Sequence, residues 1–155
     1  MIFRLFEEGD ALEVSELIAK TLRTTNIKDY PKEYIENDVK KLNPQGIIKR
    51  AKWMHLYVFI DNCKIVGCGG IGPYYDSLDE SSLFTIFVLP EYQGKGIGRK
   101  IIETLENDEY FLRAKRIEIP ASKTACQFYI KMGYNYKNSI DKVDDEGLYR
   151  LEKWR

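Results

Sequence analysis

Apolar and polar residues alternate along this chain in two different rhythms. In the first third, apolar side chains recur every three or four positions, which is the spacing of an amphipathic helix. Asp10 suits the N-cap of one such helix, and Pro31 suits the first turn of another. The pattern predicts a short strand at residues 3–6 and helices at residues 11–22 and 32–42, and it leaves residues 47–52 unassigned.

The rest of the chain reads mainly as strands, with two helices between them. Runs of β-branched and aromatic residues are separated by tight polar connections such as residues 61–64. Glycines within the run at 65–71 indicate bulges or close approach of another backbone. The predicted strands are 54–60 and 65–71 as a hairpin, 82–88, 116–119, and a closing hairpin of 134–140 with 149–154. The predicted helices are 97–107 and 123–132.

Length and composition indicate one globular domain that spans residues 1–155. The chain has 155 residues, 44% of them hydrophobic, and its 24 basic residues balance 24 acidic ones. The balanced charge argues against nucleic-acid binding, which usually needs a basic excess. No apolar run approaches the roughly 20 residues that cross a bilayer, and the N-terminus lacks a signal-peptide layout. We therefore expect a cytoplasmic protein that binds neither nucleic acid nor membrane.

Three cysteines, Cys63, Cys68 and Cys126, are odd in number and lack C-x-x-C spacing. Neither a disulfide framework nor a zinc site is indicated by this arrangement. We expect no bound metal.

A glycine-rich segment joins a predicted strand to a predicted helix at residues 93–98, which read Gln-Gly-Lys-Gly-Ile-Gly. Such a turn leaves amide N–H groups without partners, and the positive end of the helix dipole faces the same space. Glycine lets the main chain approach phosphate oxygens closely. Lys95, Arg99 and Lys100 add positive charge beside the turn. The segment predicts a binding site for a diphosphate.

Three known phosphate-binding loops could contain this segment. A P-loop is excluded because its final Lys-Ser/Thr pair is absent. In the dinucleotide fingerprint, Arg99 stands where the third glycine belongs, and Pro90 separates the strand from the turn. Glu118, about 20 residues further on, nevertheless matches the ribose-binding acid of that fold. The third pattern, Q/R-x-x-G-x-G/A after Val-x-Pro, matches residues 88–98 at every defined position.

This third pattern resembles the pyrophosphate loop of the GCN5-related N-acetyltransferase (GNAT) family. A second segment, residues 125–134, resembles the family motif A-x-x-F-Y-x-x-x-G-[FY], and the two occur in the family's order and at a family-like separation. The resemblance covers most of the chain and is weakest before residue 50. It implies a single N-acetyltransferase domain of the α/β (α+β) class. The fold it implies has a mixed, mostly antiparallel sheet of six or seven strands flanked by about four helices.

The resemblance also implies a reaction and a cosubstrate. Acetyl-CoA would donate its acetyl group to a primary amine of a small molecule or peptide, by direct attack in a ternary complex. Coenzyme A would lie where strands 82–88 and 116–119 splay apart, with backbone groups of Phe87 and Val88 beside the pantetheine arm. Cofactor binding falls on Phe87, Val88, Gln93, Gly94, Lys95, Gly96, Ile97, Gly98, Arg99, Ser122 and Tyr129.

Tyr129 occupies the position of the family's general acid, which protonates the departing thiolate. Phe128 and Tyr129 also suit the hydrophobic core, and neighbouring helix residues can serve both purposes because they point about 100° apart. Ser122 departs from the family, which commonly has Asn there. Cys126 lacks a neighbouring His, so we interpret it as a small buried residue and not as a nucleophile.

The general base is less clearly indicated. The strand at 82–88 begins Ser-Leu-Phe-Thr-Ile and carries no titratable side chain there, and the single histidine, His55, suits a structural role. Glu80 is our first candidate for a catalytic base, acting through water, with Asp79 and Glu118 as alternatives. An enzyme without a dedicated base, which accepts the neutral minority form of the amine, is a further alternative.

The acceptor would lie between residues 24–34 and residues 142–149, where acidic and aromatic side chains gather. Such a rim suits a cationic amine, although acids in loops also simply aid solubility. Two alternatives to a small-amine enzyme stay open, namely a protein N-terminal or lysine acetyltransferase and a non-catalytic acyl-CoA-binding regulatory module. The resemblance is compatible with a homodimer.

Overall fold

The computed structural model describes residues 1–155 and contains one seven-stranded sheet in the order β1-β2-β3-β4-β5-β7-β6. Neighbouring strands run antiparallel except for β4 and β5, which are parallel. The strands are β1 (Ile2–Leu5), β2 (His55–Asp61), β3 (Lys64–Pro73), β4 (Glu80–Val88), β5 (Arg116–Ala121), β6 (Asn135–Tyr136) and β7 (Tyr149–Trp154). The helices are α1 (Ala11–Thr24), α2 (Lys32–Lys41), α3 (Pro44–Ala51), α4 (Ile97–Leu105), α5 (Glu109–Leu112) and α6 (Cys126–Lys131). This arrangement confirms the predicted α/β class and the mixed, mostly antiparallel sheet.

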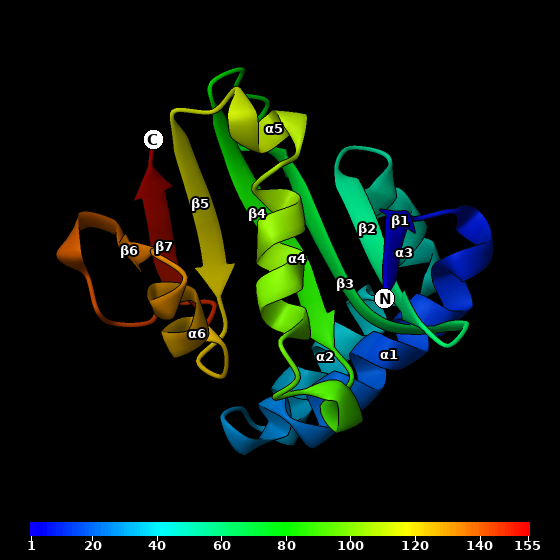
Figure 1. Cartoon of the computed structure of the whole chain (residues 1–155). Helices are drawn as coiled ribbons and strands as arrows, with labels where there is room; N and C mark the ends of the chain where they lie inside the picture. Colours follow the sequence, from blue (N-terminus) through cyan, green and yellow to red (C-terminus); the bar gives the residue numbers. More distant parts are fainter.

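The sheet is covered on both faces. Figure 1 shows α4 crossing the front of β3 and β4, with α6 beside β5 on the same side, while α1 to α3 gather behind and below. Glycines in β3 let α4 approach closely, because a Cβ at Gly69 would lie 2.5 Å from Cγ2 of Ile101. The expectation of close backbone approach at these glycines is therefore confirmed.

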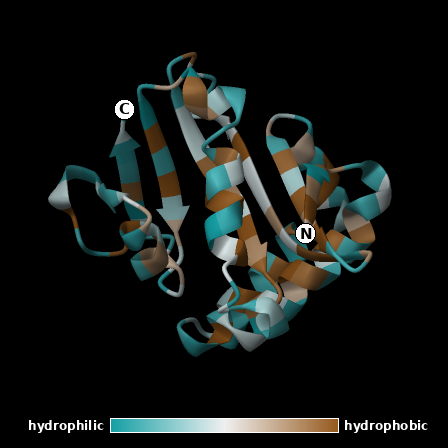
Figure 2. Cartoon of the chain, in the orientation of Figure 1, coloured by the Kyte–Doolittle hydropathy of each residue, from teal (hydrophilic) through white to brown (hydrophobic).

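The hydrophobic core fills the space between the sheet and the helices. A single cluster of 31 buried residues includes Ile18 of α1, Ile35 of α2, Leu83 of β4 and Ile101 of α4. Figure 2 shows hydrophobic colour concentrated along the central strands, with hydrophilic residues on the surfaces of the helices that face solvent. No helix combines the length and the apolar character that crossing a membrane would require.

Several element boundaries differ from the sequence expectation. Residues 44–51 form α3, whose first turn is capped by the Asn43 side chain accepting from the Gly46 amide at 2.8 Å. A further short helix, α5, begins after Asp108, whose carboxylate accepts from the Tyr110 amide. The expectation of about four helices is thus too low, because short capped turns lack the long periodicity that predicts a helix.

The predicted strand at 134–140 is mostly wrong. Only Asn135 and Tyr136 pair with β7, and Lys137–Ser139 form a 3₁₀ turn. Asn138 and Ser139 have φ angles of 55° and 60°, a left-handed conformation that cannot continue a strand. Similarly, α6 begins at Cys126 and not at residue 123, because the preceding residues form a turn around Ser122.

Candidate active site

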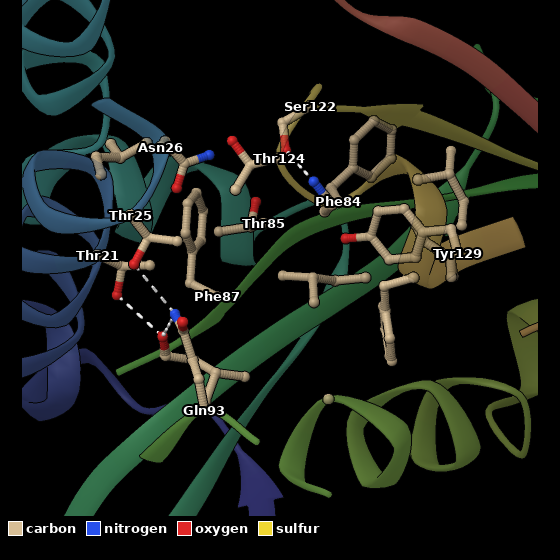
Figure 3. A pocket seen from close by; sticks show the side chains of 18 of the residues that line it. Thr21, Thr25, Asn26, Phe84, Thr85, Phe87, Gln93, Ser122, Thr124 and Tyr129 are labelled. Carbon is tan, nitrogen blue, oxygen red and sulfur yellow. Dashed lines mark hydrogen bonds between the residues drawn. The ribbon is translucent and has the colours of Figure 1, made fainter. Parts of the chain in front are cut away.

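A cavity of about 530 Å³ opens where β4 and β5 diverge (Figure 3). The two strands pair only from Glu80 to Ser82 with Arg116 to Glu118, and they separate beyond that point. The walls come from β4, β5, the turn into α4, α6, and the inner sides of α1 and α2. The splayed strands that the sequence predicted are therefore present, and the predicted glycine turn lies on the same cavity.

A β-bulge in β4 bends the strand within the cavity wall. Cys68 of β3 pairs with Phe87 and Gly70 pairs with Phe84, so β4 carries one extra residue between these pairs. Thr85 in the bulge has a φ of 57°, which is a strained conformation for a β-branched residue. Nη1 of Arg50 donates to its hydroxyl at 3.2 Å. Such strain is typical of functional sites, and here it lies in the β4 wall of the cavity.

The turn from Gly94 to Arg99 has the free donors that an anion site needs. None of its amide N–H groups donates a hydrogen bond to a backbone or side-chain acceptor. Gly94 and Gly96 have φ angles of 77° and 83°, and a Cβ at either would meet no heavy atom within 4 Å. The open space over these glycines, the free amides and the N-terminus of α4 together fit a diphosphate.

Gln93 ties this turn to the end of β4 and to α1. Its Nε2 donates to the Val88 carbonyl at 3.1 Å and to Oγ1 of Thr25 at 3.3 Å (Figure 3). The hydroxyl of Thr21 donates to the same carbonyl at 3.2 Å. The side chain of Gln93 therefore helps to fix the conformation of the turn. This role does not require direct contact with a phosphate.

Replacing Gln93 with alanine should loosen the turn without removing any of its free amides. Losing these two hydrogen bonds should cost about 1–2 kcal/mol of binding free energy, since each contributes about 0.5–1.5 kcal/mol. We expect the Kd for coenzyme A, measured by calorimetry, to rise about tenfold. The exposed Gln127 of α6 provides a control, and Gln127→Ala should leave the Kd unchanged. Equal affinities for the two variants would contradict a positioning role for Gln93.

Tyr129 reaches the cavity from α6. Its side chain is 5% exposed, its hydroxyl donates no hydrogen bond to another residue, and Figure 3 shows that hydroxyl pointing into the cavity. Burial, together with the nearby Cys68, raises the pKa of the Tyr129 phenol well above its usual value. The phenol therefore stays protonated at physiological pH and is available as a proton donor.

A thiolate in this environment would accept that proton readily. Cys68 lies against the same part of β4, where its Sγ donates to the Thr85 carbonyl at 3.2 Å, and burial raises its pKa to about 12. A thiolate held at this depth would be destabilised for the same reason, because burial disfavours the charged form. Transfer of a proton from Tyr129 to such a sulfur is chemically reasonable.

A family model described as "Acetyltransferase (GNAT) domain" matches residues 52–136, which is more than half of the chain. The chain belongs to the GNAT acetyltransferase family. This family uses acetyl-CoA to transfer an acyl group, so the predicted family and cosubstrate agree with the match. No curated protein sequence matches the chain significantly.

Solved structures of GNAT proteins have the same fold. The chain resembles PaiA N-acetyltransferase from Thermoplasma acidophilum in complex with coenzyme A at 17% identity and a TM-score of 0.83, with 99% of this chain and 98% of the other covered. A GCN5-related N-acetyltransferase from Rhodopseudomonas palustris gives 20% identity and a TM-score of 0.81, with 99% and 95% covered. A ribosomal-protein-alanine N-acetyltransferase from Brucella melitensis gives 15% identity and a TM-score of 0.67, with both chains fully covered. At these identities the likeness concerns the fold.

Within this GNAT domain, most of the predicted cofactor residues line one cavity. They are Phe87, Val88, Gln93, Gly94, Gly96, Ile97, Gly98, Arg99, Ser122 and Tyr129. Lys95 lies outside this set, with its Nζ 5.1 Å from the centre of the Tyr92 ring. The Ser122 hydroxyl accepts from the Ala125 amide at 3.1 Å and so starts the turn into α6.

The structure does not bring Glu80 to the cavity. Glu80 lies at the opposite end of β4, and its carboxylate accepts from Nε of Arg116 at 3.2 Å. Glu118 is buried against Arg116 and Lys137, which donate to it at 2.9 and 2.8 Å. Asp79 lies in the loop before β4 and accepts no hydrogen bond from Arg116 or Lys137. All three predicted bases are therefore separated from Tyr129 and from the glycine turn.

The same buried network removes the dinucleotide-binding alternative. Glu118 is held by side chains of this chain, so its oxygens are not available to a ribose, and the sheet is mostly antiparallel. His55 has a structural role, since its Nδ1 lies 2.8 Å from Asp108, which also accepts from the Tyr57 hydroxyl at 2.6 Å. Cys126 is buried, and burial raises the pKa of its thiol, as expected of a packing residue.

Asn26 and Tyr30, from the range 24–34 that the sequence assigned to the acceptor, line the cavity. Sequence reasoning missed two polar residues from the helices on either side, Thr21 of α1 and Asp38 of α2. One signal could have found Asp38: it lies three and four positions after Ile35 and Tyr34, so it interrupts the apolar face of its helix. A carboxylate on the inward face of a helix requires a reason, because burying a charge is unfavourable.

Proposed function

We propose that residues 1–155 form a single N-acetyltransferase domain that acetylates a primary amine of a small molecule or peptide. The amine would attack acetyl-CoA directly while both are bound. The observation that carries this proposal is the convergence, on one cavity between the splayed strands, of a free-amide glycine turn and the hydroxyl of Tyr129, which forms no hydrogen bond within the chain.

The residues of the chain fit the parts of acetyl-CoA. The amides from Gly94 to Arg99 would hold the diphosphate, and the backbone of Phe87 and Val88 would lie along the pantetheine arm. When bound, acetyl-CoA supplies an acetyl group activated as a thioester. Phe84, Phe87 and Phe128 line the cavity, so they would exclude water from the reacting atoms.

Tyr129 would donate its proton to the departing sulfur. Such acid catalysis typically contributes about 10²–10⁴ in rate. The strained bulge at Thr85 sits within the same wall, where backbone N–H groups of β4 could polarise the acetyl carbonyl. One such donor is worth about 3 kcal/mol in other enzymes. These roles support direct transfer and require no acetylated residue of the enzyme.

The test combines a binding measurement with a turnover measurement. Coenzyme A at about 100 times its Kd should stabilise the protein by about 2.7 kcal/mol and raise its Tm by about 5–10 °C. A panel of amines and peptides with acetyl-CoA should release free thiol for at least one acceptor. Stabilisation without any thiol release would indicate a non-catalytic acyl-CoA-binding module. Thiol release only with polypeptides would indicate a protein acetyltransferase.

A further inference from the structure

Asp38 of α2 contributes a carboxylate to the wall of the cavity. It lines the cavity beside Tyr34 and Ile35 of the same helix, and Asn26 and Tyr30 come from the connection before α2. Arg50 of α3 bonds Thr85 of the bulge in β4 and lies close enough to Asp38 to act on its charge.

No other residue of the cavity wall can accept a proton from an amine near neutral pH. The lining residues include no histidine, no lysine and no second carboxylate, and Arg99 is their only permanent cation. Burial raises the pKa values of Tyr30, Tyr34 and Tyr129 of the wall, and these phenols stay protonated. Asp38 is thus also the only group of the wall that could pair with an ammonium ion.

No structural contact occupies the carboxylate of Asp38. It forms no ion pair within 4.0 Å and accepts no hydrogen bond from another side chain or amide. The charges that act on it are those of Lys41 of α2 and Arg50 of α3. Arg50 donates its hydrogen bond to the Thr85 hydroxyl and not to Asp38. Burial raises the pKa of the Asp38 carboxyl above its usual value despite these two cations. A carboxylate that is partly desolvated and unpaired is typical of a functional site.

The surroundings of Asp38 indicate the kind of amine. Tyr30 and Tyr34 stack at 4.3 Å between ring centres, and their hydroxyls donate to the carbonyls of Gly147 and Glu146 at 2.6 and 2.7 Å. The tyrosine hydroxyls are therefore occupied, and the pair ties the cavity wall to the loop before β7. Most of the remaining cavity wall is apolar, with Leu22, Ile35 and Leu148 among the lining residues.

We propose that Asp38 binds the amino group of the acceptor and takes its proton, and that the acceptor is a small primary amine with an apolar or aromatic body. This proposal rests on the acetyltransferase function proposed above. As the amine nitrogen bonds to the acetyl carbon, the carbon–sulfur bond breaks, and the nitrogen becomes acidic enough to release one proton to Asp38. The sulfur leaves with its bonding electrons and takes a proton from Tyr129. Both side chains return to their starting states by proton exchange with solvent.

The negative charge on Asp38 should lower the free energy of unfolding. Because its pKa is higher in the folded than in the unfolded chain, the folded state holds the proton more tightly, and stability falls as pH rises through the two pKa values. At neutral pH the folded protein carries this penalty in full. Asp38→Asn should therefore keep or raise the Tm, so that a loss of activity cannot be ascribed to unfolding.

The experiment measures acetylation of 2-phenylethylamine by the full chain and by Asp38→Asn. We expect kcat/KM to fall about 100-fold, the usual size of a lost general base, with the Kd for coenzyme A unchanged. Glu33→Gln is the matched control, because Glu33 is exposed in the first turn of the same helix, and it should keep full activity. The profile of kcat/KM against pH should lose, in Asp38→Asn, the acidic limb that the wild type shows.

The acceptor class is tested with phenylalanine, which carries a carboxylate beside the same amine. The wild type should prefer 2-phenylethylamine, because a second carboxylate would be repelled by Asp38, and Asp38→Asn should lose that preference. Full activity of Asp38→Asn, or equal use of both acceptors by the wild type, would overturn the proposal. Thiol release with other amines but not with 2-phenylethylamine would overturn the acceptor class. Absence of thiol release with every amine would instead refute the acetyltransferase function and remove the basis of this proposal.

Discussion

Gly96→Leu is expected to abolish measurable binding of coenzyme A. The φ of Gly96 is 83°, and its missing Cβ leaves open the space over the free amides that lead into α4. A leucine side chain would fill that space and displace the diphosphate. Loss of two hydrogen bonds to a charged group, at about 1.5–3 kcal/mol each, predicts a Kd at least about 100-fold higher. Calorimetric titration with coenzyme A measures this directly.

The control must separate blocked binding from backbone strain. A side chain at a left-handed position costs roughly 1–2 kcal/mol wherever it occurs. Gly133, after α6, has a φ of 100°, and a Cβ there would meet only the flexible end of the Lys153 side chain at 3.3 Å. Gly133→Leu should lower the Tm about as much as Gly96→Leu while keeping normal affinity. Normal affinity in Gly96→Leu would show that the diphosphate binds elsewhere.

Tyr129→Phe is expected to slow acetyl transfer by about 10²–10⁴ while it leaves coenzyme A affinity nearly intact. The substitution removes only the hydroxyl that would protonate the sulfur, and the ring keeps its place in the core. Because that hydroxyl donates no hydrogen bond, its loss should not lower the Tm. The raised pKa of Tyr129 also predicts that wild-type kcat shows no decline from this group below pH 10. Steady-state kinetics with thiol detection provides the measurement.

Tyr134→Phe is the matched control, and it should lower stability while it leaves the rate unchanged. Tyr134 is fully buried outside the cavity, and its hydroxyl donates to Oε2 of Glu106 at 2.9 Å. Its removal should cost about 1 kcal/mol of stability, measured by urea unfolding, and leave kcat unchanged. An unaltered rate in Tyr129→Phe would exclude Tyr129 from the mechanism.

The elements of this fold that local patterns could predict are those with a local physical cause. The glycine turn at 93–98 depends on left-handed backbone and free amides, and both follow from neighbouring residues. The amphipathic helices α1 and α2 and the hairpin β2–β3 likewise depend on spacing within one segment. These signals were sufficient to indicate the family, the cosubstrate and the class of fold.

Tertiary structure alone decided how the site is completed. From the sequence, Glu80 at the start of β4 is the first candidate base, and Asp38, 42 positions earlier in the chain, is not a candidate at all. The choice depends on which strand end opens and which helix face lies beside it. The pairing of β4 with β5 stops after Ser82, and the bulge at Thr85 follows within the wall of the cavity. Arg116 captures Glu80 only because the parallel register places these two residues opposite each other. Burial and pairing are properties of the assembled chain, and they determine which carboxylate keeps a free, reactive oxygen.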